Sequence, residues 1–268
     1  MKLIDTDFFQ NYKATALWGD SLGWHERNGG NFTYWLTPNE VQSVSTELSG
    51  NDLWYDVGAA VPELSGEAFL VSGTGKYFHH FKDRPLECAG IIILDETGTR
   101  YRIVAGLENN GHPTSELPTH LMNLAAKKRD GQDIRVVYHA HCPNLIAMTF
   151  LLPLDSSVFT RELWQMMTEC PVIFPEGVGV LPWMVPGGRL IAQATSELMP
   201  DYNAVIWAHH GIFCAGKDFD QAIGLMQAIE KSAAIWIKVH SCAAAPQQTI
   251  TPENMRELSE AFSVALKM

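Results

Sequence analysis

The spacing of apolar positions changes along the chain between a helical and a strand-like period, which predicts a mixed α/β protein. Apolar side chains at close to helical spacing predict a helix within residues 3–24. Short, mostly apolar runs predict strands at residues 32–36 and 68–72. Residues 37–66 are polar and weakly patterned, and they predict no element.

Two apolar runs, residues 88–96 and 100–106, flank Thr97 and Gly98 and predict a β-hairpin. An antiparallel pair argues against a purely parallel sheet. No G-x-G-x-x-G sequence follows a predicted strand, so we expect no dinucleotide site. No linker rich in Ser, Gly or Pro, charge block or internal repeat divides the chain, and we therefore expect one domain that spans residues 1–268.

Periodicity predicts more helices in the second half of the chain. They are expected at about residues 144–152, at 160–169 with Thr160 as the cap, at 188–199, in a long amphipathic helix that Asp218 or Asp220 caps, and in a final helix with Pro252 at its first position. Residues 172–183 predict two short strands joined by a turn.

A further helix is predicted to start near Ser115, because Thr114 or Ser115 suits the N-cap and Pro118 is tolerated only in a first turn. Glu116 would then lie at the helix N-terminus, where the helix dipole favours the ionised carboxylate. Thr114 and Ser115, with free helix N–H groups, also form a plausible anion site. An ordinary first-turn carboxylate would have the same pattern.

Two predicted strands end in histidines. The first ends in His139 and His141, whose side chains project to the same side because strand residues alternate faces. The second, residues 203–213, contains His209 and His210, of which only one can face a shared metal, and spacing does not decide which. Three imidazoles with a displaceable fourth ligand describe a catalytic zinc site. The alternative is that these histidines only form hydrogen bonds near the sheet edge.

Two glycine-containing segments offer donors for an anion. Residues 25–31 contain Asn28 and Asn31, whose side-chain amides can donate, beside two glycines that leave backbone N–H groups accessible. Residues 73–76 could form a nest of successive N–H groups, to which Thr74 adds a hydroxyl. They are not a Walker A loop, which needs G-x-x-x-x-G-K-[ST]. From local pattern alone, a helix-to-strand turn is favoured over a ligand loop at residues 25–31, and a plain turn is equally compatible with residues 73–76.

Composition excludes several classes of function. The net charge of -11 argues against sequence-independent nucleic-acid binding but leaves room for a small anionic substrate. The longest apolar stretch, residues 170–187, is interrupted by prolines and cannot be a membrane helix. Acidic residues stand where a signal peptide would have its apolar core, and five scattered cysteines are typical of reduced thiols. We therefore expect a cytoplasmic protein.

Several stretches together resemble the class II, zinc-dependent L-rhamnulose-1-phosphate aldolases. They are residues 26–31 (ERNGGN), 73–78 (GTGKYF), 113–118 (PTSELP), 139–141 (HAH), 159–164 (FTRELW), 168–170 (TEC), 177–187 (GVGVLPWMVPG) and 210–213 (HGIF). The Trp-containing stretch and the TEC point to the rhamnulose branch. The resemblance implies an α/β fold with a central, largely antiparallel sheet flanked by helices on both faces.

The resemblance also implies roles for single residues. The ligands of one Zn²⁺ per subunit match His139, His141 and His210, which selects His210 over its neighbour. Glu116 matches a catalytic carboxylate, and Glu169 matches a second acidic residue that reaches an active site across a subunit interface. The positions that hold the substrate phosphate match Asn28, Asn31, Thr74, Gly75, Thr114 and Ser115.

The reaction so implied is the reversible cleavage of L-rhamnulose 1-phosphate to dihydroxyacetone phosphate and L-lactaldehyde. The expected partners are these small molecules and further copies of the chain, a tetramer by resemblance, with neither nucleic acid nor membrane. Alternatives are an L-fuculose-phosphate aldolase, an L-ribulose-5-phosphate 4-epimerase, or a non-catalytic assembly domain like the adducin head. A scaffold would not need three metal ligands and Glu116.

Overall fold

The computed structural model describes residues 1–49, 53–242 and 246–267. The nine strands of the described residues form one sheet in the order β2-β5-β4-β3-β1-β6-β9-β8-β7. They are β1 (Asn31–Trp35), β2 (Tyr55–Asp56), β3 (Ala68–Ser72), β4 (Ala89–Leu94), β5 (Arg100–Gly106), β6 (Val136–Ala140), β7 (Gly179–Leu181), β8 (Ala204–Trp207) and β9 (Gly211–Gly216). Among these strands only the β7–β8 pair is parallel, which confirms the expected largely antiparallel sheet.

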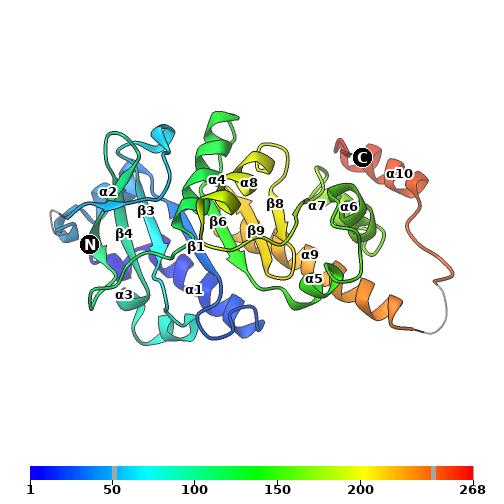
Figure 1. Cartoon of the computed structure of the whole chain (residues 1–268), viewed down its shortest axis with the longest axis horizontal. Helices are drawn as coiled ribbons and strands as arrows, with labels where there is room; N and C mark the ends of the chain where they lie inside the picture. Colours follow the sequence, from blue (N-terminus) through cyan, green and yellow to red (C-terminus); the bar gives the residue numbers. More distant parts are fainter. Residues whose placement is uncertain (50–52, 243–245, 268) are drawn as a thin grey trace.

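Helices cover both faces of the sheet (Figure 1). The α-helices are α1 (Asp7–Ser21), α2 (Pro38–Ser43), α3 (Pro85–Cys88), α4 (Leu117–Arg129), α5 (Pro143–Met148), α6 (Ser156–Trp164), α7 (Cys170–Ile173), α8 (Arg189–Leu198), α9 (Phe219–His240) and α10 (Pro252–Phe262). Short 3-10 helices are η1 (Leu3–Asp5), η2 (Ser45–Glu47), η3 (Pro62–Leu64) and η4 (Phe78–Lys82).

The alternation of strand side chains divides the core into two layers. Phe32 and Tyr138 point to the layer under α1 and α9, whereas Val137 and Phe213 point to the layer under α4 and α8. Because both sheet faces are covered, the strands are buried over most of their length. The start of β1, the end of β6 and the start of β9 meet at one edge of the sheet and carry or adjoin polar side chains, so this edge is a place at which the sheet can present chemistry.

Two helix starts differ from the predictions. Helix α6 begins at Ser156 and not at Thr160, because the Asp155 carboxylate accepts hydrogen bonds from backbone N–H groups of the first turn. Helix α4 begins at Leu117, so Glu116 itself occupies the N-cap position, and its side chain makes no capping hydrogen bond. The residues predicted as caps of these two helices are therefore not the caps.

Two predicted strand regions also differ. Residues 172–183 contain one strand, β7, and not two, because Cys170–Ile173 forms the short helix α7. Residues 203–213 contain two strands, β8 and β9, which pair in antiparallel fashion. His209 and His210 thus lie in the turn between strands and not at the end of a single strand.

Residues 37–66 contain α2, η2, β2 and η3 in their described part, although apolar periodicity predicted no element there. Helix α2 depends on a reciprocal capping box between Thr37 and Glu40, a polar pattern, which explains why apolar spacing missed it. The 88–106 hairpin, Asp218 as the cap of α9 and Pro252 at the start of α10 are confirmed.

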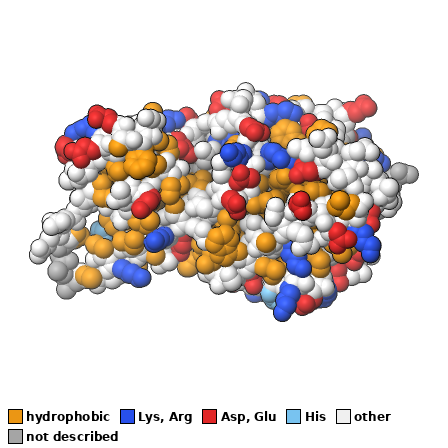
Figure 2. Space-filling view, turned by 180° about the vertical axis from the view of Figure 1, so that it is seen from behind, with side chains coloured by type: hydrophobic (Ala, Val, Ile, Leu, Met, Phe, Trp, Pro, Cys, Tyr) orange, Lys and Arg blue, Asp and Glu red, His pale blue; other side chains and the backbone are white. Residues whose placement is uncertain are grey.

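None of the helices in the described ranges is long and apolar enough to cross a membrane. On the face of the molecule shown in Figure 2, Lys and Arg side chains are interspersed with Asp and Glu side chains. Hydrophobic side chains gather between these charges in several separate groups on the same face.

Candidate metal and substrate site

Three imidazoles meet where β6 ends and the β8–β9 turn begins. His139 lies on β6, His141 directly follows it, and His210 lies in the turn. One ring nitrogen from each lies within 4.8 Å of the other two. The ring centroids are 5.2 Å apart for His139 and His141, 5.0 Å for His139 and His210, and 4.9 Å for His141 and His210. Such a cluster has the size needed to coordinate one metal ion.

The conformation of the turn separates His209 from His210. His209 has a φ of 61°, in the left-handed region, which sends the side chains of the two neighbours in different directions. The backbone N–H of His209 donates to Thr149 Oγ1 at 3.0 Å, and its ring Nδ1 lies 3.0 Å from the same oxygen. Its ring also packs on Phe150 with centroids 4.1 Å apart. His209 is therefore engaged at the end of α5, whereas His210 joins the cluster.

Hydrogen bonds orient two of the three imidazoles. His139 Nδ1–H donates to the carbonyl of Ile212 at 3.0 Å, which leaves Nε2 as a bare acceptor. That buried Nε2 has no hydrogen-bond partner among the described residues. His141 Nδ1 lies 2.6 Å from Glu26 Oε1, an arrangement common for metal-binding histidines. The orphaned nitrogen and the carboxylate–imidazole pair both fit a bound metal.

Two histidines of the cluster, His139 and His210, are held in the form that binds a metal. Burial lowers the pKa of His139 well below its usual value, and the neighbouring imidazoles lower it further. Burial likewise lowers the pKa of His210 to about 4. Both rings are therefore neutral near pH 7, and neutral imidazole is the ligand that metals require.

A polar cavity of about 140 Å³ opens beside the cluster. Its lining consists of Asn28, Gly29, Gly30, Asn31, Gly73, Thr74, Gly75, Thr114, Ser115, Glu116, His139, His141 and His210. The structure thus brings together every predicted site residue except Glu169. Glu169 lies exposed at the start of α7, outside this lining.

The segment 25–31 is anchored by a residue that the sequence did not single out. The imidazole of His25 is buried, with Nδ1–H donating to the Gly29 carbonyl at 3.0 Å and Nε2 lying 2.5 Å from Tyr138 Oη. A Cβ on Gly30, whose φ is 71°, would lie 2.3 Å from that ring. Only glycine therefore lets the segment fold over His25 and reach the cavity.

The two remaining donor segments hold one another in place. Thr74 N–H donates to the His112 carbonyl at 2.9 Å, and Thr114 N–H donates to the Ser72 carbonyl at 2.8 Å. Gly75 has a φ of 68°, which turns the chain back over the cavity. The hydroxyl-bearing residues of both segments consequently face a common space with the amides of segment 25–31.

Glu116 joins the metal cluster to the polar cavity. Its Oε2 accepts a hydrogen bond from Asn31 Nδ2 at 2.9 Å and lies 3.6 Å from His139 Nε2. Asn31 on β1 in turn pairs with His139 on β6 in the strand register. Burial raises the pKa of the Glu116 carboxyl, against the opposing effects of Asn31 and His141. Burial thus acts on this pKa in the direction opposite to the effect expected from the helix dipole.

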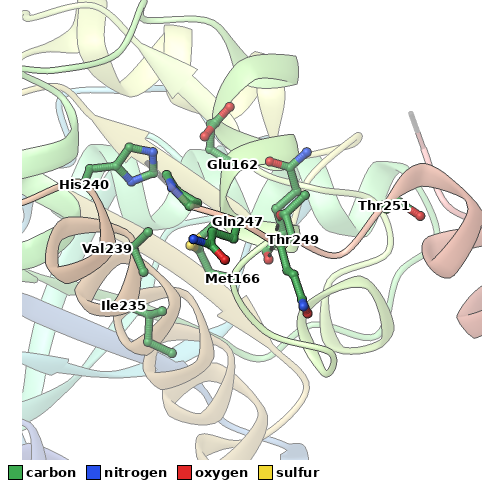
Figure 3. Close-up of a pocket in the computed structure, with 11 residues that line it drawn as sticks. Glu162, Met166, Ile235, Val239, His240, Gln247, Thr249 and Thr251 are labelled. Carbon is green, nitrogen blue, oxygen red and sulfur yellow. Dashed lines mark hydrogen bonds between the residues drawn. The ribbon is translucent and has the colours of Figure 1, made fainter. Parts of the chain in front are cut away.

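A larger hollow, of about 760 Å³, lies between α6, the end of α9 and residues 246–251 (Figure 3). Its two titratable groups are already engaged. Glu162 Oε2 accepts from Trp236 Nε1 at 2.9 Å, and the His240 ring stacks on Trp236 at 3.9 Å. No residue of its described lining is shared with the histidine cavity. The groups suited to catalysis therefore gather in the smaller cavity.

Known proteins resemble this chain along nearly its whole length. A protein named rhamnulose-1-phosphate aldolase from Listeria innocua is 41% identical over 99% of this chain and 96% of its own. Another of that name from Mannheimia succiniciproducens is 44% identical over 90% of this chain and 89% of its own.

Solved structures share the fold. The crystal structure of a sugar-phosphate aldolase from Thermotoga maritima matches with a TM-score of 0.75 at 25% identity, covering 90% of this chain and 98% of that one. An L-fuculose 1-phosphate aldolase matches in fold with a TM-score of 0.61 at 17% identity, covering 97% of both chains. The family model for the class II aldolase and adducin N-terminal domain matches residues 12–237. The chain belongs to the class II aldolase and adducin family.

Proposed function

We propose that the chain is a zinc-dependent lyase that reversibly cleaves L-rhamnulose 1-phosphate to dihydroxyacetone phosphate and L-lactaldehyde. The observation that carries this proposal is the cavity that contains three clustered imidazoles, a buried carboxylate and a set of uncharged donors. Relatives named rhamnulose-1-phosphate aldolase, at 41% and 44% identity, support the choice of substrate.

His139, His141 and His210 would hold one zinc ion per subunit, with Glu26 orienting His141. The zinc, when bound, supplies Lewis-acid stabilisation of the negative charge that develops when the carbon–carbon bond is broken or formed. No lysine Schiff base is then required, and we assign no lysine to the reaction.

We assign the proton transfer to Glu116. In the synthetic direction its carboxylate takes a C–H proton from dihydroxyacetone phosphate as a general base. Its burial, which raises the pKa of the carboxyl, suits a group that must accept and return a proton. Asn31 holds Oε2 by a hydrogen bond of 2.9 Å and so limits the directions in which the carboxylate can point.

The substrate phosphate would be held by the uncharged donors that line the cavity, which are Asn28, Asn31, Thr74, Gly75, Thr114 and Ser115. Hydroxyls, amides and backbone N–H groups can bind a phosphate without a cluster of cations. This agrees with a chain whose net charge is -11. Fixing the phosphate also fixes the reacting carbon relative to Glu116.

The test is incubation with dihydroxyacetone phosphate and L-lactaldehyde, with and without a chelator, followed by determination of the product's configuration. We expect L-rhamnulose 1-phosphate, with formation abolished by the chelator and restored by zinc. Predominant formation of the fuculose isomer would contradict the substrate assignment. Epimerisation of L-ribulose 5-phosphate without aldol product would contradict the reaction class.

We further propose a homo-oligomer, a tetramer by resemblance, in which Glu169 completes the site of a neighbouring subunit. The exposure of Glu169 at the start of α7, outside its own cavity, supports this. Mixing Glu116→Ala and Glu169→Ala subunits tests it, because hybrids would contain sites with both carboxylates only if Glu169 acts in trans. Regained activity is expected, and hybrids as inactive as their parents would contradict the proposal.

The five cysteines carry no disulfide, and all but Cys242 are buried, which supports a reducing, cytoplasmic location. One sheet runs through the described strands from β2 to β7, and this supports a single domain over residues 1–268.

A further inference from the structure

Asn31 is held on two sides. Its Nδ2 donates to Glu116 Oε2 at 2.9 Å, and its Oδ1 forms a close hydrogen bond with His120 Nε2. His120 is fully buried on α4, and its ring lies 5.3 Å from that of Phe213. The imidazole touches the amide from the side opposite the carboxylate, and it is absent from the cavity lining.

Hydrogen-bond chemistry determines which atom of each group does what. As the general base proposed above, Glu116 acts as an ionised carboxylate that only accepts, so the Asn31 amide turns its N–H₂ toward Glu116 and its oxygen toward His120. His120 must then donate from Nε2, which defines its tautomer. Burial lowers the pKa of His120 to about 3, so the ring is neutral and carries one proton. We place that proton on Nε2, where it satisfies the Asn31 oxygen in preference to the backbone of Val137, which also hydrogen-bonds the ring.

His120 and Glu116 lie on the same turn at the start of α4. His120 N–H donates to the Glu116 carbonyl at 3.2 Å within the first turn of α4. Asn31 begins β1 and pairs with His139 across to β6. The contacts from His120 through Asn31 to Glu116 therefore connect α4 to the strand end beside the metal cluster.

We propose that His120 is a positioning residue, which holds the Asn31 amide in the one orientation that donates to Glu116. Without the Nε2–H donor, the amide can rotate by a half turn and present its oxygen to the carboxylate, which repels it. The proposal rests on the proposed function only in so far as Glu116 is the base. The alternative is that His120 only packs against Phe213. In that case its size would matter, but the position of its ring proton would not.

Two variants separate the donor from the volume. His120→Gln retains an N–H₂ at about the reach of Nε2, whereas His120→Leu fills part of the space without a donor. We expect His120→Leu to slow exchange of the dihydroxyacetone-phosphate C–H proton with solvent deuterium about 10–100-fold, as outer partners of active-site groups commonly do. His120→Gln should recover most of that loss, and bound zinc should be unchanged in both. Equal loss in both variants, or normal exchange in His120→Leu, would overturn the proposal.

A double-mutant cycle with Asn31→Ala tests whether His120 acts through Asn31. Because the effect is transmitted by the amide, His120→Leu should change exchange less than about 2-fold once Asn31 is alanine. If the fold-reduction in exchange of the double variant equals the product of the two single fold-reductions, His120 acts independently of Asn31. That result would contradict the proposal.

The ¹⁵N resonances of His120 in the zinc-loaded wild-type protein give a readout independent of catalysis. A protonated Nε2 with a bare Nδ1 is expected, and the opposite tautomer would refute the inference even if the enzyme is active. Conversely, absence of exchange in the wild type would refute the proposed function, while the tautomer would still decide the role of His120 toward Asn31.

Discussion

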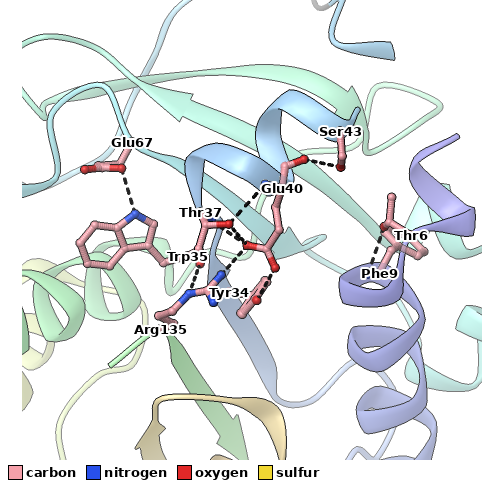
Figure 4. Close-up of polar contacts among 9 residues, drawn as sticks. All are labelled: Thr6, Phe9, Tyr34, Trp35, Thr37, Glu40, Ser43, Glu67 and Arg135. Atoms are coloured by element: carbon pink, nitrogen blue, oxygen red, sulfur yellow. Dashed lines mark hydrogen bonds and ion pairs between the residues drawn. The ribbon is translucent and has the colours of Figure 1, made fainter. Parts of the chain in front are cut away.

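The two ends of the antiparallel β1–β6 pair carry carboxylates with opposite surroundings. At one end, Glu40 accepts hydrogen bonds from Tyr34 Oη at 2.7 Å, Thr37 N at 2.7 Å and Thr37 Oγ1 at 2.8 Å. Arg135 pairs with the same carboxylate while its Nε donates to the Trp35 carbonyl at 3.0 Å (Figure 4). The donors around Glu40 thus include a full positive charge.

At the other end, the Glu116 carboxylate has fewer hydrogen-bond and ion-pair partners than Glu40. It accepts one side-chain hydrogen bond, from Asn31, and faces the bare Nε2 of His139 at 3.6 Å. In the described part of the chain, no lysine or arginine forms an ion pair with it. Glu116 is also the more deeply buried of the two, at 6% exposure.

The two pKa values move in opposite directions for physical reasons. Burial opposes ionisation of Glu40, but the hydrogen bonds from Thr37 and Tyr34 and the charge of Arg135 together lower the pKa. At Glu116 burial prevails and raises the pKa. A saturated carboxylate contributes to stability, whereas an under-satisfied buried one costs stability and is available for chemistry. The same strand pair therefore has a structural end and a reactive end.

The largest effect is expected from removing a metal ligand at the reactive end. His210→Ala should lose nearly all bound zinc and nearly all aldol activity, because two imidazoles do not complete the ligand set. The control is His209→Ala, which changes a histidine that contacts Thr149 and should keep about one zinc per subunit. Metal analysis after dialysis measures both, and equal metal loss would remove the distinction between the two histidines.

The next effect concerns the base. Glu116→Gln should reduce C–H exchange of dihydroxyacetone phosphate by about 10²–10⁴-fold, the usual contribution of a general base. Zinc content and melting temperature should stay close to wild type, since Gln can occupy the same volume. Unchanged exchange would show that the base lies elsewhere and that Glu116 is not a reactive carboxylate.

At the structural end the expected loss is in stability and not in activity. Glu40→Gln should lower the free energy of unfolding by about 1–2 kcal/mol, because the side chain is partly exposed and its charged hydrogen bonds are discounted accordingly. The exposed Glu257 offers a matched control. Glu257→Gln should change the free energy of unfolding by less than about 0.5 kcal/mol. Denaturant titration gives both values, and aldol activity should remain within about 2-fold.

The smallest effect is a pH dependence of the same variant. The lowered pKa of Glu40 means that its contribution to stability is present above the unfolded glutamate pKa of about 4.3 and is lost as pH falls through the lower folded value. The difference in unfolding free energy between wild type and Glu40→Gln should therefore be largest near pH 7 and shrink below about pH 4. A difference that grows on acidification would contradict the assigned direction.

Local pattern predicted the β1 and β3 strands, the 88–106 hairpin and the shared face of His139 and His141, since these depend on alternation and turn chemistry. Residue spacing could not select His210 over His209. That choice follows from a left-handed backbone conformation stabilised by Thr149, a contact 60 residues away in sequence.

Two positioning groups were missed for different reasons. His120 occurs among apolar residues of α4, and only its place one turn after Glu116 hints at a role. His25 was included in a glycine-containing segment but is distinguished by a buried contact with Tyr138. The raised pKa of Glu116 depends on burial by residues distant in sequence. The position of Glu116 at a helix start does not reveal this burial.

The pairing of Asn31 with His139 has a consequence for protein engineering. Shifting β1 by one residue would carry Phe32 to the cavity and Asn31 into the aromatic layer, since successive strand residues face opposite sides. An insertion or deletion of one residue within β1 or β6 would have the same effect. Recombination of this scaffold with related chains should therefore keep residues 31–140 from one parent, because a crossover between β1 and β6 would pair strands of different origin.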